Sequence, residues 1–147
     1  MATVELRFSA QPEHVRTARL VAAAVARRAG VDEAVLDEVR LAVGEACSRA
    51  VGLHRSHGVD APVRVVLTEE EKLFSIEVGD EVPGSGGGAA AVPGVRGSEP
   101  DELDDGAEDE MGLAVISGLV DDVEVRSGES GGIIRMSWPT TPVTVLP

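Results

Sequence analysis

The chain has 147 residues, of which 43% are hydrophobic but only 2% aromatic, so we expect one domain with a core of Val, Leu, Ile and Ala. The net charge of −13 argues against direct binding to DNA or RNA, which needs cations to displace counterions from phosphates, and it favours encounter with a basic protein partner. A single cysteine, an N-terminus without a signal-peptide pattern and the lack of an apolar run of ~20 residues predict a cytoplasmic protein that does not span a membrane.

The first 30 residues predict a strand followed by a helix. Val4, Leu6 and Phe8 alternate with polar residues, a period of two that is typical of a half-buried strand. Pro12 suits the first turn of a helix that continues to residue 28. Gly30 then ends this helix as a C-terminal cap.

Residues 32–54 carry the most informative pattern of the chain. We expect Asp32 to cap a helix that runs to about His54. Its core-facing stripe has apolar residues at spacings of three and four, namely Val35, Val39, Ala42, Val43, Ala46, Ala50 and Leu53. Another face carries Glu45 and Arg49 one helical turn apart. This spacing suits either a surface salt bridge or part of a functional site.

The next segments predict a hairpin and then a long connection. Strands are expected over residues 63–67 and 74–78. Residues 80–110 lack periodicity, begin rich in glycine and end with eight carboxylates and no basic residue between 98 and 110. A connection of this length is typical of a lid, a binding segment or a disordered linker.

The last part of the chain completes the predicted fold. We expect a short apolar helix over residues 111–120, strands around 123–125 and 134–138, and an irregular tail over 140–147. Strands joined by tight turns pair antiparallel. The sequence therefore predicts an α+β two-layer sandwich, in which about three helices cover one face of a mixed, mostly antiparallel sheet.

Three segments combine residue types that a nucleotide pocket needs. The helix over residues 32–54 carries Glu45. A buried strand ends at Asp80, whose carboxylate could accept from an adenine amino group or could serve as an ordinary turn residue. Gly112 opens a helix, where a glycine either spaces the chain or lets backbone N–H groups approach phosphates.

The order and spacing of these segments resemble the GHKL-type ATPase fold, in the branch of bacterial anti-sigma factors that are serine kinases (the SpoIIAB/RsbW type). The resemblance covers nearly the whole chain, and it is carried by residues 6–10, 45–48, 80–84, 111–116 and 120–125. It implies a single GHKL-like domain over residues 1–139, with 80–110 as a lid and 140–147 as a tail.

The resemblance assigns roles to residues at matching positions. Glu45 matches the general base that activates a serine of the partner protein. Asp80 matches the aspartate that holds the adenine. Gly84 and Gly112 match glycines that line the phosphates.

The resemblance also implies protein partners. Arg19 matches an arginine of the partner-docking surface, to which we also assign Arg16. Proteins of this type hold a sigma factor inactive, and a STAS-domain antagonist competes for them until its phosphorylation releases it. We therefore expect a sigma factor and/or a STAS-domain anti-anti-sigma factor as partners. A homodimer through the sheet edge or the first strand is a further expectation.

Three residues depart from the family pattern. Arg49 stands at the position of the magnesium-binding asparagine, and a guanidinium has no acceptor for a metal. Val82 and Glu110 stand at positions of glycines, and Glu110 adds negative charge beside the expected phosphates. Arg49 is expected to pair with Glu45 and weaken it as a base. Alternatively, its cation could hold a phosphate in place of the metal.

These departures decide between two functions. The sequence predicts an anti-sigma-factor-like regulator that binds ATP weakly or not at all, with no cofactor and no metal site. The alternative is an active serine kinase that uses ATP with Mg²⁺ to phosphorylate a STAS-type antagonist.

Overall fold

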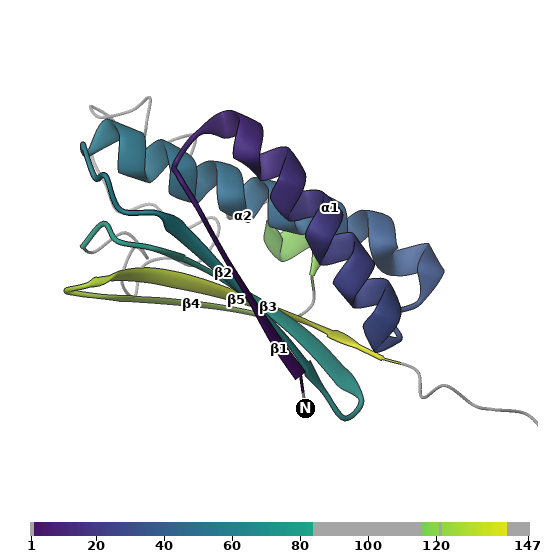
Figure 1. Ribbon diagram of the computed structural model, residues 1–147. Helices are drawn as coiled ribbons and strands as arrows, with labels where there is room; N and C mark the ends of the chain where they lie inside the picture. The colour runs from purple at the N-terminus through teal and green to yellow at the C-terminus, as the bar shows by residue number, and fades with distance from the viewer. Residues whose placement is uncertain (1, 84–115, 121, 141–147) are drawn as a thin grey trace, which may run out of the picture.

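The computed structural model describes residues 2–83, 116–120 and 122–140. The helices lie together on one face of a single sheet (Figure 1), which confirms the predicted two-layer α+β sandwich. Most of the predicted lid and the tail after residue 140 lie outside the described residues. Residues 116–119 form the described part of the third predicted helix.

The sheet has five strands in the order β1-β2-β3-β5-β4. They are β1 (Ala2–Phe8), β2 (Val63–Glu70), β3 (Leu73–Asp80), β4 (Asp122–Gly128) and β5 (Gly131–Pro139). All four pairings between these described strands are antiparallel, so the expected mixed sheet has no parallel pair here. The strand β3 is therefore central, and β1 and β4 form the edges.

The first helix, α1, spans Pro12–Ala29 and ends as the sequence predicts. Gly30 adopts the left-handed conformation with φ of 103°, and its backbone N–H bonds back to carbonyls of the last turn. Glycine accepts this conformation without steric cost. The chain can therefore reverse at once and lead into the second helix.

The second helix, α2, spans Leu36–Ser56 and is preceded by a 3₁₀ turn over Glu33–Val35. The side chain of Asp32 accepts a hydrogen bond from the backbone N–H of Ala34, at 2.9 Å. Asp32 thus caps the 3₁₀ turn, whereas the sequence places it at the start of the long helix itself. The difference arises because the 3₁₀ turn tightens the entry into the helix.

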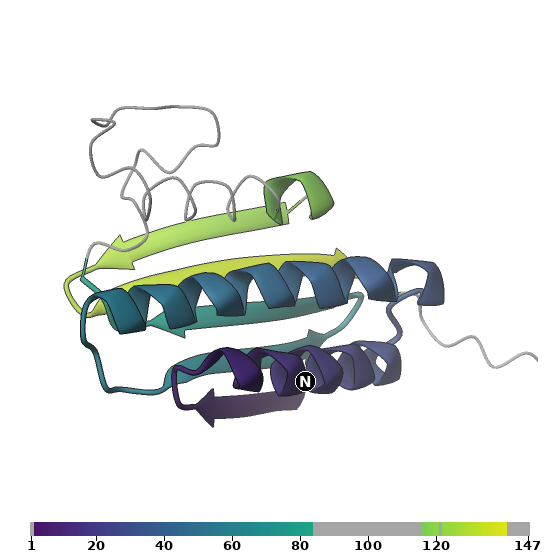
Figure 2. The same ribbon diagram turned by 90° about the horizontal axis from the view of Figure 1, so that it is seen from above.

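The core lies between the sheet and the two long helices, which run side by side over it (Figure 2). The helix α2 packs on α1 beside it and, within the sheet, mainly on the central strand β3. Phe74 and Ile76 of β3 are completely buried, as is Cys47 of α2. Burial raises the pKa of the Cys47 thiol to about 12, because the thiolate would lose its hydration. No helix among the described residues is long and apolar enough to cross a membrane.

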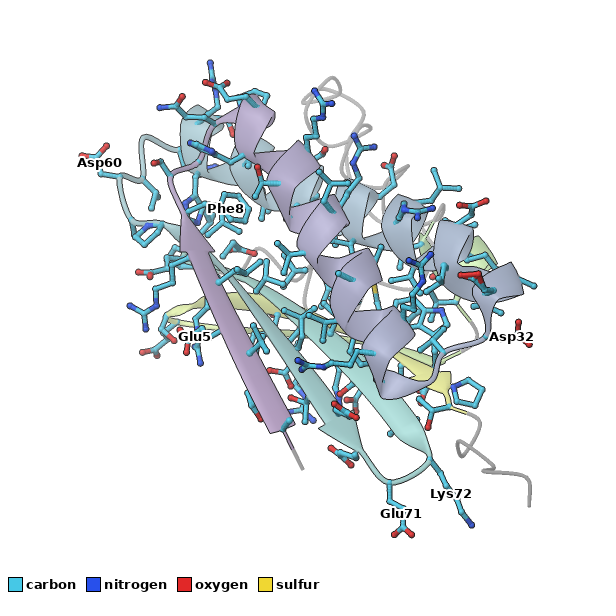
Figure 3. The ribbon with its side chains drawn as sticks, turned by 45° about the vertical axis from the view of Figure 1, so that its right-hand side comes forward. Glu5, Phe8, Asp32, Asp60, Glu71 and Lys72 are labelled. Atoms are coloured by element: carbon cyan, nitrogen blue, oxygen red, sulfur yellow. The ribbon has the colours of Figure 1, made fainter. Side chains whose placement is uncertain are left out.

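The opposite face of the sheet is polar and exposed. Glu5 accepts from the guanidinium groups of Arg7 and Arg64, at 2.7 and 3.1 Å. The hydrogen bond from Arg7 is the main cause that lowers the pKa of Glu5. At the β2–β3 turn, Glu71 and Lys72 project away from the molecule (Figure 3). This pattern agrees with a sheet that is covered on one face only.

Candidate functional site

A groove between the outer surfaces of α1 and α2 brings together three of the predicted site residues. It encloses about 260 Å³ and is lined by Pro12, Val15, Arg16, Arg19, Leu41, Gly44, Glu45 and Ser48. The two arginines assigned to partner docking and the glutamate assigned as general base therefore share one surface. They reach it from different helices because α1 and α2 lie side by side over the sheet (Figure 2).

Arg19 crosses from α1 onto the backbone of α2 at Gly44. A Cβ atom added at Gly44 would lie only 2.8 Å from Cδ of Arg19, which is closer than such atoms approach in proteins. The missing side chain thus leaves space for the stem of Arg19. Glu45 follows Gly44 directly, so the seat of the arginine adjoins the candidate base.

The structure does not contain the predicted ion pair between Glu45 and Arg49: among the described residues, no salt bridge joins them. With 3.6 residues per turn, side chains four positions apart are offset by about 40° around the helix. Glu45 is half-buried and borders the groove toward α1, whereas Arg49 is 8% exposed. The i,i+4 spacing permits the pair, but the two side chains lie in different surroundings.

Asp80 occupies the end of the central strand, as predicted, and is 7% exposed. Its Oδ1 accepts from the backbone N–H of Val82 at 2.8 Å and lies 3.4 Å from the backbone N of Gly132. The first of these contacts is the turn that an aspartate commonly forms two residues ahead. Oδ1 therefore stabilises the local backbone, which is the turn role left open for this residue.

The β4–β5 turn approaches the end of β3 closely. Gly131 has φ of 136°, a conformation that other residues rarely adopt. A Cβ atom at Gly131 would collide with the backbone carbonyl oxygen of Asp80. The neighbouring Gly132 pairs with Asp80 across the β3–β5 ladder. Glycine at position 131 is thus a requirement of the backbone around Asp80.

The cofactor expected from the fold can be tested against the described residues. Arg49 cannot ligate Mg²⁺, since a guanidinium offers hydrogen-bond donors and no acceptor. In residues 2–83, 116–120 and 122–140, no three His, Cys, Asp or Glu side chains gather as a metal site would require. A magnesium ion held at position 49 therefore does not fit. Gly84, Gly112 and Glu110 lie outside the described residues.

Sequence reasoning missed two features of the groove. Leu20 and Leu41 are among the exposed large hydrophobic residues, at 60% and 53%, and Leu41 lines the groove directly. The stem of Arg19 also packs against the backbone of Gly44. A glycine inside a helix costs roughly 1 kcal/mol relative to alanine, so its presence before Glu45 is the signal that could have revealed the close approach.

The chain is similar to known proteins over most of its length. The chain matches the histidine kinase-like ATPase domain family over residues 8–138. It is 30% identical over 144 residues to the serine-protein kinase RsbW of Bacillus pumilus, a match that covers 91% of this chain and 83% of that protein. It is 29% identical over 129 residues to the anti-sigma F factor of Clostridium acetobutylicum, covering 88% of this chain and 87% of that one.

A solved structure supports the fold. The crystal structure of the RsbU and RsbW domains of a Mycobacterium tuberculosis protein resembles this chain with a TM-score of 0.64 at 14% identity. The likeness covers 100% of this chain and 35% of that longer one, and at this identity it speaks for the fold alone. The family match and the sequence relatives show that the chain belongs to the histidine kinase-like ATPase family, in its branch of RsbW-type anti-sigma factors.

Proposed function

We propose that this chain is a cytoplasmic regulator that binds a sigma factor and/or a STAS-domain antagonist, and that it binds ATP weakly or not at all. The groove between α1 and α2 carries the proposal. We call its surroundings the docking face, defined as Arg16, Arg19 and Leu20 of α1 with Leu41 and Glu45 of α2. Related proteins are named anti-sigma F factor and serine-protein kinase RsbW, which supports partners of this kind.

The docking face has the chemistry of a protein-binding surface. Leu20 and Leu41 expose 60% and 53% of their surface, and such side chains gain most when a partner removes them from water. Arg16 and Arg19 add planar donors suited to carboxylates, and arginine is enriched among residues that dominate binding energy. The surface thus combines apolar anchors with cations.

Charge gives this face its selectivity. The docking face holds two arginines and one carboxylate, whereas the whole chain has a net charge of −13. A basic partner is attracted to the molecule as a whole, but the surface against α1 favours carboxylates. We therefore expect the partner to present an acidic patch beside an apolar one.

The proposal of weak ATP binding depends on position 49. A buried guanidinium in place of an amide removes an oxygen that could ligate Mg²⁺. Asp80 keeps a buried carboxylate at the end of β3, which suits the amino group of an adenine. The proposed site therefore keeps a carboxylate for the adenine, at Asp80, and lacks the oxygen ligand for Mg²⁺ at position 49 that a kinase requires.

Binding of purified partners tests the proposal. The sigma factors and STAS-domain proteins of the source genome are titrated individually by calorimetry into the chain and into two variants. Arg19→Glu should weaken binding by at least about tenfold, since it reverses a charge in the docking face. Arg28→Glu makes the same charge change on α1 outside the groove and should leave affinity within about twofold. If none of these proteins binds, the proposal is wrong.

One observation favours the kinase alternative. Glu45, the residue assigned as general base, borders the docking face, so a docked partner would bring its side chains near this carboxylate. Incubation with labelled ATP, Mg²⁺ and a STAS-domain protein decides the matter. Phosphoserine that forms with the natural chain and disappears in Glu45→Ala would establish a kinase, and no label would support a binding protein.

A further inference from the structure

His54 joins three separate parts of the fold at the last turn of α2. The side chain is completely buried. Its Nδ1 lies 2.9 Å from the backbone carbonyl oxygen of Ala61, in the loop between α2 and β2. Its Nε2 accepts from the backbone N–H of Glu81, also at 2.9 Å, just beyond the end of β3. One imidazole therefore ties α2 to the start of one strand and to the end of another.

These two partners fix the protonation state of the ring. A carbonyl oxygen can only accept, so Nδ1 must carry a proton when it faces Ala61. A backbone N–H can only donate, so Nε2 must offer its lone pair to Glu81. The geometry thus requires the neutral imidazole with its proton on Nδ1. A second proton on Nε2 would abolish the bond from Glu81 and leave a cation in a buried position.

The bond to Glu81 acts on the segment that orients Asp80. Glu81 lies between Asp80 and Val82, and Oδ1 of Asp80 accepts from the N–H of Val82. The turn over residues 80–82 is therefore held by Asp80 from within and by His54 from the side. A loss of the bond from His54 would remove this lateral support, while the contacts of Oδ1 of Asp80 with the backbone of Val82 and Gly132 would remain.

We infer that His54 is a positioning residue: its neutral imidazole fixes the turn that carries Asp80, and protonation of the ring releases that turn. The consequence for ligand binding deepens the proposed function, and it rests on the role proposed there for Asp80 toward adenine. The consequence for the turn itself stands on the two hydrogen bonds alone.

The charged groups around the ring do not substitute for these bonds. His54 lines a cavity of about 410 Å³ with Arg55 of α2 and Asp60 of the following loop, and the lining residues 9–11 carry no charge. At the end of β3, the ionisable residues next to this contact are Asp80 and Glu81. The hydrogen bonds of the ring to Ala61 and Glu81 are nevertheless to backbone groups, and together they require the neutral ring. Figure 3 shows Asp60 projecting outward at this end of the molecule.

Two substitutions separate the contacts of the ring. In His54→Gln the terminal amide reaches about as far as Nε2, so its oxygen can still accept from Glu81. In His54→Asn the shorter amide reaches only about as far as Nδ1, so it can donate to Ala61 but cannot reach Glu81. The pair thus keeps a buried polar side chain at position 54 and changes only which backbone group is satisfied.

Hydrogen exchange of individual amides in the ¹⁵N-labelled full chain tests the inference. In the natural chain, the Glu81 amide should be protected from exchange near neutral pH. Its protection should fall about tenfold when the pH is lowered and the His54 ring takes up a second proton. The spectrum of the His54 ring near neutral pH should show the proton on Nδ1. His54→Asn should remove this protection at every pH. His54→Gln should keep it without pH dependence, and the amide of Ile76 in β3 should stay protected in all three proteins.

The inference is overturned if protection of the Glu81 amide in the natural chain does not follow the titration of the ring, a result that needs no variant to fold. It is also overturned if His54→Asn leaves that protection unchanged. Calorimetry with ADP, without metal, addresses the second consequence: binding should weaken about tenfold in His54→Asn and persist in His54→Gln. Failure of the natural chain to bind ADP would refute the adenine role of Asp80, and the amide data would still decide the role of His54.

Discussion

The side chain of Arg19 lies against the bare backbone of Gly44, so that a Cβ atom at position 44 would come within 2.8 Å of Cδ of the arginine. This contact joins two helices through their outer surface, where helices usually meet through core residues. It places a cation of α1 beside Glu45 of α2 in the same groove. The glycine thus determines where the arginine of the docking face lies.

Replacement of Gly44 by alanine should separate stability from binding. The new methyl group displaces the flexible stem of Arg19, which can move at little cost, while alanine gains up to about 1 kcal/mol of helix stability. We therefore expect a melting temperature that is unchanged or higher, and an affinity for the partner that falls at least about fivefold. Calorimetric titration with the partner and a thermal melt measure the two effects.

Gly52 offers a matched control on the same helix. It is exposed, and a Cβ atom there would have no neighbour within 4 Å. Gly52→Ala should raise stability by a similar amount and leave partner affinity unchanged. Equal effects of the two substitutions on affinity would show that the seat of Arg19 has no part in docking.

Replacement of Gly131 by alanine should destabilise the fold. The position has φ of 136°, and a methyl group would collide with the backbone carbonyl of Asp80. Backbone at the end of the central strand cannot move as a flexible side chain does, so we expect a loss of at least about 2 kcal/mol in the free energy of unfolding. Urea denaturation measures the loss.

The same turn contains the control for this prediction. Gly128 pairs with Gly131 across the β4–β5 ladder, but a Cβ atom there would meet nothing within 4 Å. Gly128→Ala should change the free energy of unfolding by no more than about 0.5 kcal/mol. A Gly131→Ala protein as stable as Gly128→Ala would contradict the requirement for glycine at position 131.

The secondary structure could be predicted because it depends on local patterns. Alternation of Val4, Leu6 and Phe8 determines which face of β1 is buried, and Gly30 ends α1 where its left-handed conformation is needed. The antiparallel pairing of β2 with β3, and of β4 with β5, also follows from the tight turns that join them. These features require no knowledge of how distant segments meet.

The site was less predictable because its contacts join distant segments. Spacing alone places Glu45 and Arg49 within reach, but packing gives them different environments, one bordering the groove and one buried. His54 carries no sequence signal for its role, since its partners are backbone groups 7 and 27 residues away. Backbone partners leave no trace in residue type. Only the fold reveals such bonds.

The buried thiol predicts a specific pH dependence of stability. The folded pKa of Cys47 is raised to about 12 from the ordinary value of 9.0, because burial disfavours the thiolate. Between about pH 9 and 12, the thiol of Cys47 therefore keeps its proton in the folded state and loses it in the unfolded state. This contribution is fully present below about pH 9 and is lost between about pH 9 and 12, with a slope of about 1.4 kcal/mol per pH unit.

Comparison with Cys47→Ala isolates this contribution, because lysine and arginine titrate alike in both proteins. Urea denaturation at pH 8, 9.5 and 10.5 should show the natural chain losing stability faster than the variant on the alkaline side. The native thiol should also react slowly with a disulfide reagent at pH 8. Parallel pH profiles for the two proteins would mean that the thiol titrates normally in the fold.

Arg49→Asn should restore part of a magnesium-dependent nucleotide site. Asparagine supplies a carbonyl oxygen of the kind that Mg²⁺ ligates, and it removes a guanidinium that cannot do so. We expect the variant to bind ATP at least about tenfold more tightly in Mg²⁺ than in its absence, whereas the natural chain should show no such difference. Arg49→Leu removes the same charge without adding an oxygen, so it should not gain metal dependence. Micromolar binding of Mg-ATP by the natural chain would refute the proposed loss of the magnesium ligand. An equal gain in Mg²⁺-dependent ATP affinity in Arg49→Leu would show that the effect comes from the lost charge and not from a new metal ligand.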